Sequence, residues 1–354
     1  MAPKVPAALT PSGTVSPNAG PEGGPPERSA WLGAVDKVGD FWIVGVLVLM
    51  ILVFGLDSPN HDLFTRASWL NTSQYAVEFL ILAVGETFVI ITGGIDLSVG
   101  AVLGFTGMVS GAVMQSMLSS HSDALLTTVV GFAVALLLGT FIGFVNGYII
   151  TRLKLPPFIV TLGSLTAVGA APALINGGNE ISNLPSQVST IGSAAIANWV
   201  YYTVVVAAAV CIVMGLVLHR TRFGLRTYAV GSNNLGARRA GINVDSHLVR
   251  VYMVSGFLGG LAGMMVMANF SVATPIAGQN DELNAIAAVV IGGASLFGGR
   301  GHMLGTVVGT FIIALLVTGL VLVGVSGSWQ EVATGIIIVA AVAVDQVRLR
   351  LAER

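Results

Sequence analysis

Long apolar stretches, separated by short polar segments, recur along most of this chain. From Phe41 onward ten such stretches approach the roughly 20 residues that a helix needs to cross a membrane. They lie near 39–56, 69–92, 98–118, 124–152, 156–176, 197–219, 247–270, 282–297, 302–324 and 329–347. The stretch at 282–297 is short and interrupted by glycines, so it is the weakest candidate for a full crossing. The pattern predicts an all-α integral membrane protein with about ten transmembrane helices.

The segments that flank this apolar region are short and polar. The first 30 residues are rich in Pro, Gly and Ser, and they lack the charged start, apolar core and cleavage site of a signal peptide. We expect residues 1–38 to be a disordered cytoplasmic tail. Residues 39–347 then form the transmembrane domain, and residues 348–354 form a cytoplasmic C-terminal tail.

Composition supports a membrane protein. Hydrophobic residues make up 54% of the 354 residues and charged residues 9%, whereas soluble domains carry about 25% charged residues. A surface that faces water cannot be built from so few charges. The single cysteine, Cys211, lies in an apolar run and is interpreted as a small buried hydrophobe rather than a redox or metal residue.

The distribution of basic residues gives an orientation. Lysine and arginine favour cytoplasmic loops. With ten spans and an inner N-terminus, Arg66 is the one cation, out of 16, that falls in an outer loop. Both termini are therefore predicted to be cytoplasmic. The outer loops are acidic or neutral and include Asp281 and Glu282; these acids either meet a partner or are simply excluded from the positive side.

Several functional motifs are missing from the sequence. No lysine belongs to a phosphate-binding G-x-x-x-x-G-K-[ST] loop, and no span carries the H-E-x-x-H pattern of a metalloprotease. The five histidines fall near predicted membrane edges, where interfacial or loop roles are favoured over metal ligation or proton relay. The chain is therefore predicted to be a channel or transporter without an ATPase site of its own.

The longest internal polar segment, about 219–247, lies on the predicted inner side. Ser232, Asn233 or Asn234 can cap a helix N-terminus, and Gly241 can close its C-terminus in a left-handed turn. Between them the sequence predicts a helix of about two turns along the inner surface. This helix either touches anionic lipid headgroups or docks into a soluble partner, and the residues alone do not separate the two interpretations.

Five ordered motifs resemble the ribose-type permeases of bacterial ABC importers, across roughly residues 40–347. They are VIITGGIDLSVG (89–100), VNGY with LPPFIVTLG (145–148, 155–163), RFG with YAVG (222–224, 228–231), AGIN (240–243), and LNAIAAVVIGG with GGRG (283–293, 298–301). Such an ordered set at family-like spacing is far more specific than any one motif.

The resemblance implies a type II importer bundle in the bacterial inner membrane. Its expected partners are a second, identical or paralogous permease, a cytoplasmic ABC ATPase that binds ATP and magnesium, and an extracytoplasmic sugar-binding protein. Membrane lipid is also a partner, nucleic acid is not, and the chain binds no cofactor itself. The segment 229–243 then corresponds to the coupling helix in the ATPase cleft. The expected coupling residues are Gly231, Ser232, Asn233, Asn234, Ala237, Arg238, Arg239, Gly241 and Ile242.

Polar residues within the spans are candidates for the translocation path. Charges inside a membrane are expensive and usually face the bundle interior or water. Glu86 lies deep in the second span, and Asp96 lies at the Gly93-Gly94 break, where capping the following helix and gating are equally favoured. The path candidates are Glu86, Asp96, Asn146, Thr161, Ser164, Asn176 and Asn284, with Asn269 as a further polar position. For each of the neutral residues, a structural hydrogen bond between helices is favoured over a sugar contact.

A short internal echo accompanies these motifs. The pattern that starts at Gly93-Gly94 recurs at Gly292-Gly293, which is weak evidence for a duplication. The sequence as a whole predicts ATP-coupled, binding-protein-dependent import of a monosaccharide such as a pentose, hexose or related polyol. The rival hypothesis is a self-sufficient proton-coupled carrier that uses Glu86 or Asp96.

Overall fold

The computed structural model describes residues 30–352; the remaining residues of the predicted tails, 1–29 and 353–354, lie outside the described part. Residues 1–39 and 40–354 form separate units, and the arrangement below concerns the second. The first helix, α1, begins at Ala30, inside the segment predicted as an N-terminal tail, and the last helix continues to Ala352.

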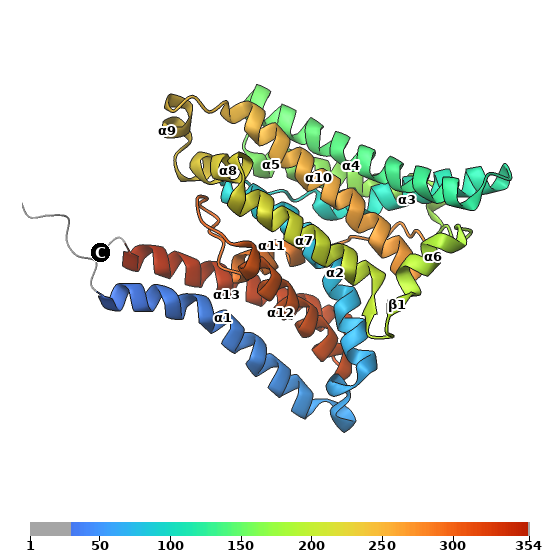
Figure 1. Cartoon of the computed structure of the whole chain (residues 1–354), viewed down its shortest axis with the longest axis horizontal. Helices are drawn as coiled ribbons and strands as arrows, with labels where there is room; N and C mark the ends of the chain where they lie inside the picture. Colours follow the sequence, from blue (N-terminus) through green and yellow to red (C-terminus); the bar gives the residue numbers. More distant parts are fainter. Residues whose placement is uncertain (1–29, 353–354) are drawn as a thin grey trace, which may run out of the picture. The chain divides into compact units, whose positions relative to one another are not determined.

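Helices account for nearly all of the regular structure (Figure 1). In chain order the elements are α1 (Ala30–Asp57), η1 (Pro59–Phe64), α2 (Arg66–Ile91), α3 (Val99–Ser119), α4 (Ala124–Leu153), α5 (Pro157–Ala170), η2 (Ala171–Leu174), η3 (Asn176–Gly178), α6 (Ser186–Ser193), β1 (Ala195–Ile196), β2 (Val200–Tyr201), α7 (Tyr202–Arg220), α8 (Arg222–Ser232), α9 (Asn234–Arg239), α10 (Val244–Phe270), α11 (Asp281–Ile291), α12 (Met303–Leu322) and α13 (Gly327–Ala352). The two strands pair in an antiparallel hairpin between α6 and α7.

Seven of the described helices are long and apolar enough to cross a membrane: α2, α3, α4, α5 with η2, α7, α10 and α12. The helix in the stretch 282–297 is α11, whose 11 residues are too short for a full crossing. The chain is therefore a multi-pass helical membrane protein, and the count of ten spans stays a prediction.

The helices α2 and α10 lie at the centre of the bundle. Most of the second half of α2, from Ala76 to Ile91, is buried, and α10 packs against α2, α3 and α4. The contact between α4 and α10 depends on glycines, because a Cβ atom on Gly139 would lie 2.2 Å from the carbonyl oxygen of Gly256. Small residues at this contact bring the two backbones together, as membrane helices require for tight packing.

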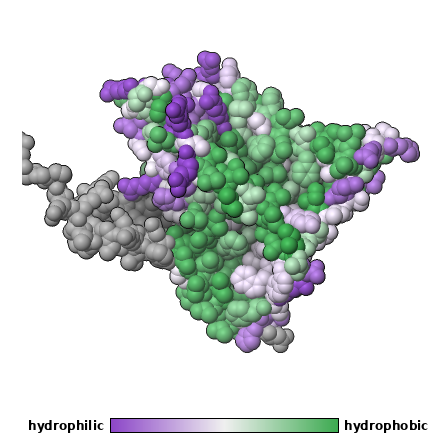
Figure 2. Space-filling model, viewed as in Figure 1, coloured by the Kyte–Doolittle hydropathy of each residue, from purple (hydrophilic) through white to green (hydrophobic). Residues whose placement is uncertain are grey.

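The outer helices present apolar side chains to their surroundings. Leu137 of α4 and Ile212 of α7 are 70% and 64% exposed, as lipid-facing residues are in a bundle without its membrane. Figure 2 shows hydrophobic residues across the middle of the visible face, with hydrophilic residues gathered around α8 and α9 and at the tip between α3 and α4. This distribution agrees with a bundle that spans a membrane between two polar ends.

The outer cation of the sequence analysis, Arg66, is engaged within the chain. Its guanidinium donates a hydrogen bond to the backbone carbonyl of Asn198 in the β hairpin. The same group lies 5.5 Å from the centre of the Trp199 ring, within cation–π range.

Candidate functional site

The Gly93-Gly94 pair ends α2 and starts a loop, Thr92–Ser98, that leads directly into α3. Gly93 has a left-handed φ of 82°, and its N–H donates to Ile90 at 2.8 Å. The N–H of Gly94 donates to the carbonyl of Val89 at 3.1 Å, which completes the turn of a Schellman cap. A side chain at position 94 would crowd a neighbour, because a Cβ atom there would lie 2.6 Å from the Tyr252 hydroxyl.

A buried carboxylate fastens this loop to the neighbouring helices. Asp96 Oδ1 accepts hydrogen bonds from the backbone N–H and the hydroxyl of Ser98, at 3.0 and 2.6 Å. Asp96 Oδ2 accepts from the Ser255 hydroxyl of α10 at 2.8 Å. Asn146 of α4 donates to the Ser98 hydroxyl oxygen at 2.9 Å. A hydrogen bond to a charged group contributes about 1.5–3 kcal/mol, so these bonds hold the loop firmly against α4 and α10.

A second carboxylate lies directly beside the first. Glu86 Oε1 accepts the backbone N–H of Asp96 at 3.0 Å. Glu86 Oε2 and the Tyr252 hydroxyl are buried and have no hydrogen-bond partner in the described chain. Because unpaired polar groups are expensive in an apolar interior, this cluster is a candidate functional site. Its members come from α2, α4, α10 and the loop between α2 and α3.

The structure bears on both interpretations of Asp96. Its carboxylate accepts the N–H of Ser98, but Ser98 is itself the N-cap residue of α3, so Asp96 positions the start of that helix rather than capping it. It also accepts a hydrogen bond from Ser255, a residue far away in the sequence. A gating role stays a prediction.

Thr161 of α5 joins the same region through the backbone. Its hydroxyl is 3.0 Å from the carbonyl oxygen of Ile95 in the loop and 3.0 Å from that of Pro157. Ser164 lies half-buried three residues further along α5. A cavity of about 260 Å³ lies next to α5, and its lining includes polar side chains before and on α11. The lining residues are Ala101, Gly104, Leu165, Gly169, Pro172, Pro275, Ala277, Gly278, Gln279, Asn280 and Glu282.

The other path candidates lie apart from this cluster. Asn176 is in a turn after α5, where its side-chain amide donates to the carbonyl oxygen of Glu180 at 3.1 Å. Asn284 lies on the first turn of α11. Asn269 lies at the end of α10, where its side-chain oxygen is buried without a hydrogen-bond partner in the described chain.

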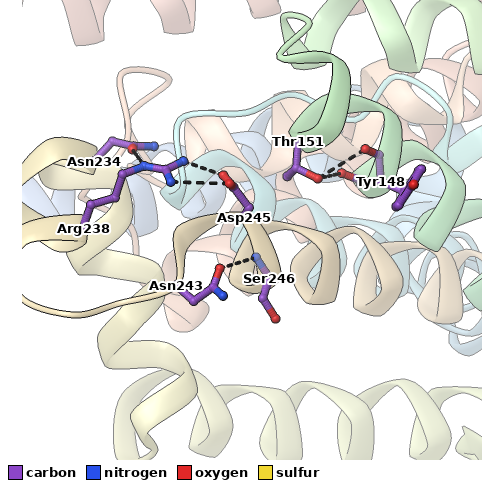
Figure 3. Close-up of polar contacts among 8 residues, drawn as sticks. Tyr148, Thr151, Asn234, Arg238, Asn243, Asp245 and Ser246 are labelled. Atoms are coloured by element: carbon purple, nitrogen blue, oxygen red, sulfur yellow. Dashed lines mark hydrogen bonds and ion pairs between the residues drawn. The ribbon is translucent and has the colours of Figure 1, made fainter.

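The predicted inner segment forms the two short helices α8 and α9. Asn233 caps α9, since its side-chain oxygen accepts the N–H of Gly236 at 2.7 Å, and Gly241 has a left-handed φ of 82° just after α9. Both local predictions are confirmed. Arg238 binds Asp245 at the start of α10 and also donates to the Asn234 side chain at 3.2 Å (Figure 3). The carboxylate of Asp245 raises the pKa of the Arg238 guanidinium, so that group stays charged.

The coupling candidates divide into exposed and buried residues. Exposed positions include Ser232, Asn233, Asn234, Arg238, Arg239 and Gly241. Leu235 is also 59% exposed, and the sequence analysis did not single it out. Ala237, in contrast, is 6% exposed and packs with Val230 and Val244, while Ile242 packs beside them. The side chain of Ala237 therefore seats α9 on the protein rather than facing a partner.

The end of α8 contacts two loops at once. A Cβ atom on Gly231 would lie 1.7 Å from the carbonyl oxygen of Ile91 and 2.7 Å from the backbone nitrogen of Gly299. Gly299 itself donates to the Ile91 carbonyl at 2.8 Å, and the Tyr228 hydroxyl of α8 donates to the Gly301 carbonyl at 2.7 Å. Gly231 is therefore packed between the break after α2 and the loop after α11, and we call this contact the α8 junction.

Three members of the buried cluster were missed by the sequence analysis: Ser98, Tyr252 and Ser255. Ser98 belongs to the quoted motif at 89–100, so its polar side chain within a span was a usable signal. Tyr252 and Ser255 are three residues apart on α10 and share a face. Nothing in the local sequence indicates that this face meets Asp96.

A bundle of long apolar helices with a polar cluster inside it and a charged helical segment at one end defines a multi-pass membrane protein. A family profile described as a branched-chain amino acid transport system, permease component, matches residues 68–342. The chain belongs to this family.

Named relatives cover most of the chain. It is 37% identical over 318 residues to the ribose import permease protein RbsC of Bacillus subtilis (strain 168), a match that covers 89% of this chain and 94% of the relative. It is 36% identical over 308 residues to the fructose import permease protein FrcC of Rhizobium meliloti, covering 85% and 83%. It is 33% identical over 314 residues to the D-allose transport system permease protein AlsC of Escherichia coli (strain K12), covering 88% and 92%.

Proposed function

We propose that the chain is the membrane permease subunit of an ATP-driven importer and moves a monosaccharide into the bacterial cytoplasm. The observation that carries the mechanism is the α8 junction, because it joins the exposed helix α9 to the breaks after both α2 and α11. A displacement of α9 by a partner is thereby passed to the interior of the bundle. The proposed setting is the inner membrane, in a type II bundle of about ten spans with both termini in the cytoplasm.

The proposed substrate is a pentose, a hexose or a related polyol. Support comes from the relatives, whose names specify ribose, fructose and allose. The cavity beside α5 is lined by Gln279, Asn280 and Glu282 among small residues, a composition suited to a small hydroxylated solute. We place the translocation path along α5, past Thr161 and Ser164.

Within this mechanism Glu86, Asp96 and Asn146 are positioning residues. Asp96 and Asn146 already make hydrogen bonds to protein groups, and those bonds fix the loop between α2 and α3 beside α5. A permease of this kind needs weak contacts with its substrate, because a separate binding protein supplies the affinity. The cluster then shapes the wall of the path.

The energy source is a separate cytoplasmic ABC ATPase, which holds the ATP and magnesium. The exposed face of α9, with Asn234, Leu235 and Arg238, is the proposed docking surface for it. A second permease subunit and an extracytoplasmic sugar-binding protein complete the importer, and the chain itself binds neither cofactor nor nucleic acid.

The test is purification of the tagged chain from its native membrane in mild detergent, with mass spectrometry of the proteins that remain bound. A phosphate-loop ATPase is expected in the wild-type preparation and is expected to be lost from Arg238→Glu combined with Gly241→Trp. Arg152→Glu is the matched control, since it reverses an exposed charge at the end of α4, outside the docking surface.

The contrary outcome also has a defined meaning. If no ATPase is retained, and the chain alone moves sugar in proteoliposomes under a proton gradient, the importer mechanism is wrong. The unpartnered oxygen of Glu86 then becomes the leading proton site, and Glu86→Gln is expected to abolish uptake.

A further inference from the structure

A second pocket lies away from α5, at the predicted outer end of the bundle. Polar residues spaced three or four positions apart, Ser68, Asn71, Tyr75 and Glu78, follow one face of α2. Together with the ends of α10 and α12, this face encloses a cavity of about 270 Å³. A volume of this size suits a ligand smaller than a drug molecule.

Two buried polar atoms in the wall of this pocket lack partners. The side-chain oxygen of Asn269 and the hydroxyl oxygen of Thr318 are buried and have no hydrogen-bond partner in the described chain. Thr318 is 5% exposed as a whole residue. Because buried polar groups are normally hydrogen-bonded, these two atoms indicate a ligand with its own hydrogen-bond donors.

The acidic residues at the pocket favour a cation as its ligand. Glu78 lines the cavity with Asp281 near it, and burial together with this second acid disfavours the ionised form of Glu78 unless a cation is bound. Within residues 30–352 as described, neither carboxylate forms an ion pair. No group of three His, Cys, Asp or Glu side chains in that same part is arranged to hold a metal ion. An organic cation that donates several hydrogen bonds therefore fits the pocket better than a metal ion does.

The location of the pocket indicates where such a cation comes from. Trp69 and Tyr75 are each 38% exposed on the same part of α2, as aromatic residues at a membrane interface are. Phe270 and Val321, which line the pocket, are 59% and 54% exposed, so its edge is apolar and faces the lipid. The pocket is therefore accessible from the headgroup layer of the outer leaflet.

We propose that this pocket binds a primary ammonium group, supplied by the headgroup of an aminophospholipid such as phosphatidylethanolamine. The ammonium has three N–H donors, which match the Glu78 carboxylate, the Asn269 side-chain oxygen and the Thr318 hydroxyl oxygen. Its charge is balanced by Glu78, and the acyl chains lie against Phe270 and Val321. The inference is independent of the sugar and of the ATPase.

The experiment compares lipid binding by the full chain, with the partners that co-purify, in nanodiscs. One set contains phosphatidylglycerol with phosphatidylethanolamine, and the other contains phosphatidylglycerol with phosphatidylcholine, whose trimethylated ammonium cannot donate hydrogen bonds. The wild type is expected to melt several degrees higher with phosphatidylethanolamine and to retain that lipid in native mass spectrometry. Glu78→Gln and Thr318→Val are expected to lower its retention about tenfold and fivefold, respectively.

The control variant is Glu180→Gln, which removes an exposed outer carboxylate outside the pocket and is expected to keep the wild-type lipid preference. Equal retention of phosphatidylethanolamine by the wild type and Glu78→Gln overturns the proposal. So does a rise in melting temperature on Glu78→Gln that is the same in both lipids, because Glu78 and Asp281 then share a proton and bind no ligand. Displacement of the lipid by millimolar ethanolamine supports the ammonium site and identifies a soluble amine as a second source.

Discussion

The helices α2 and α11 end in the same way, and the loops that follow them meet beside α8. Gly93 and Gly293 both have left-handed φ values, of 82° and 89°. After each, the next residue donates back to the carbonyl five positions earlier, Gly94 to Val89 and Ala294 to Val289, both at 3.1 Å. The two helix ends therefore share one Schellman geometry.

The loops themselves are held by different forces. The loop after α2 is short and is fixed by side chains, through Asp96 and its bonds to Ser98 and Ser255. The loop after α11 runs to His302 and is built largely from glycine; Gly299 and Gly301 hold it to α2 and α8 through backbone groups. A side-chain cluster fixes one loop within the bundle, whereas close backbone contact ties the other to α8, which is predicted to face the cytoplasm. The first loop is thus suited to define the path and the second to transmit movement.

The largest loss of transport is expected from a change at Gly231, where the two loops meet α8. In Gly231→Val the new side chain overlaps the Ile91 carbonyl and the Gly299 nitrogen. Overpacking of this kind costs about 1–3 kcal/mol, and it separates α8 from both loops. ATP-driven sugar uptake in proteoliposomes is expected to be largely lost, with the ATPase still bound. Gly45→Val, which meets no atom within 4 Å, is the control and is expected to transport normally.

The next largest effect, on stability, distinguishes the loop after α2 from the loop after α11. Asp96→Asn leaves one acceptor oxygen for three donors, so we expect a loss of about 1–3 kcal/mol in the free energy of unfolding. Leu296→Asn changes the corresponding position of the other loop, where the native side chain is apolar and accepts no hydrogen bond, and is expected to cost less. Thermal unfolding in detergent measures both. Equal losses contradict the assignment of different forces to the two loops.

A smaller change is expected from one partner of Asp96. Ser255→Ala removes the hydrogen bond to Asp96 Oδ2 while Ser98 still serves Oδ1, so the expected loss is about 1–2 kcal/mol. Glu86 keeps its bond to the loop backbone, and the loop stays in place. Melting temperature is again the measurement, and Ser193→Ala at an exposed position of α6 is the control, with no expected change.

The smallest effect on stability is expected at α9. The side chains of Arg238 and Asp245 are 48% and 52% exposed, and an exposed ion pair contributes about 0–1 kcal/mol. Asp245→Asn is therefore expected to leave the melting temperature nearly unchanged. Because Arg238 then loses its ion pair and is held mainly by Asn234, we expect weaker binding of the ATPase, measured as a higher dissociation constant on titration with that subunit. Unchanged affinity shows that the pair does not position the docking surface.

Local structure was predictable wherever a few neighbouring residues determine it. The apolar stretches predicted helices, and the Gly93-Gly94 pair predicted the end of α2. The cap at Asn233 and the turn at Gly241 were confirmed. The two glycine pairs end their helices with the same turn, but the predicted alignment of the pairs was shifted by one residue. The sequence pairs Gly93 with Gly292, whereas in the structure Gly93 corresponds to Gly293, because the left-handed residue is the first glycine of one pair and the second of the other.

The candidate site was less predictable, because it depends on contacts between distant residues. Asp96 and Ser255 are 159 positions apart, and they meet because glycines let α10 approach its neighbours closely. Glu78 was overlooked although it lies in the same apolar span as Glu86, and its significance depends on Asn269 and Thr318 from other helices. The start of α1 at Ala30 was also missed, because Asp36 and Lys37 separate the apolar residues after Ala30 from the long apolar stretch that follows.

The engagement of Arg66 by the β hairpin affects how other proteins reach the outer face. Its guanidinium is directed to Asn198 and Trp199, while Asp57, Asp123 and Glu180 are exposed on the predicted outer loops. An approaching soluble protein therefore meets three exposed carboxylates, while the charge of Arg66 stays fixed beside the hairpin. Electrostatic steering of this kind speeds association with a basic patch and weakens as salt rises. In the proposed importer, the association rate of a sugar-binding protein is then expected to depend on ionic strength outside the cell, before any step of transport begins.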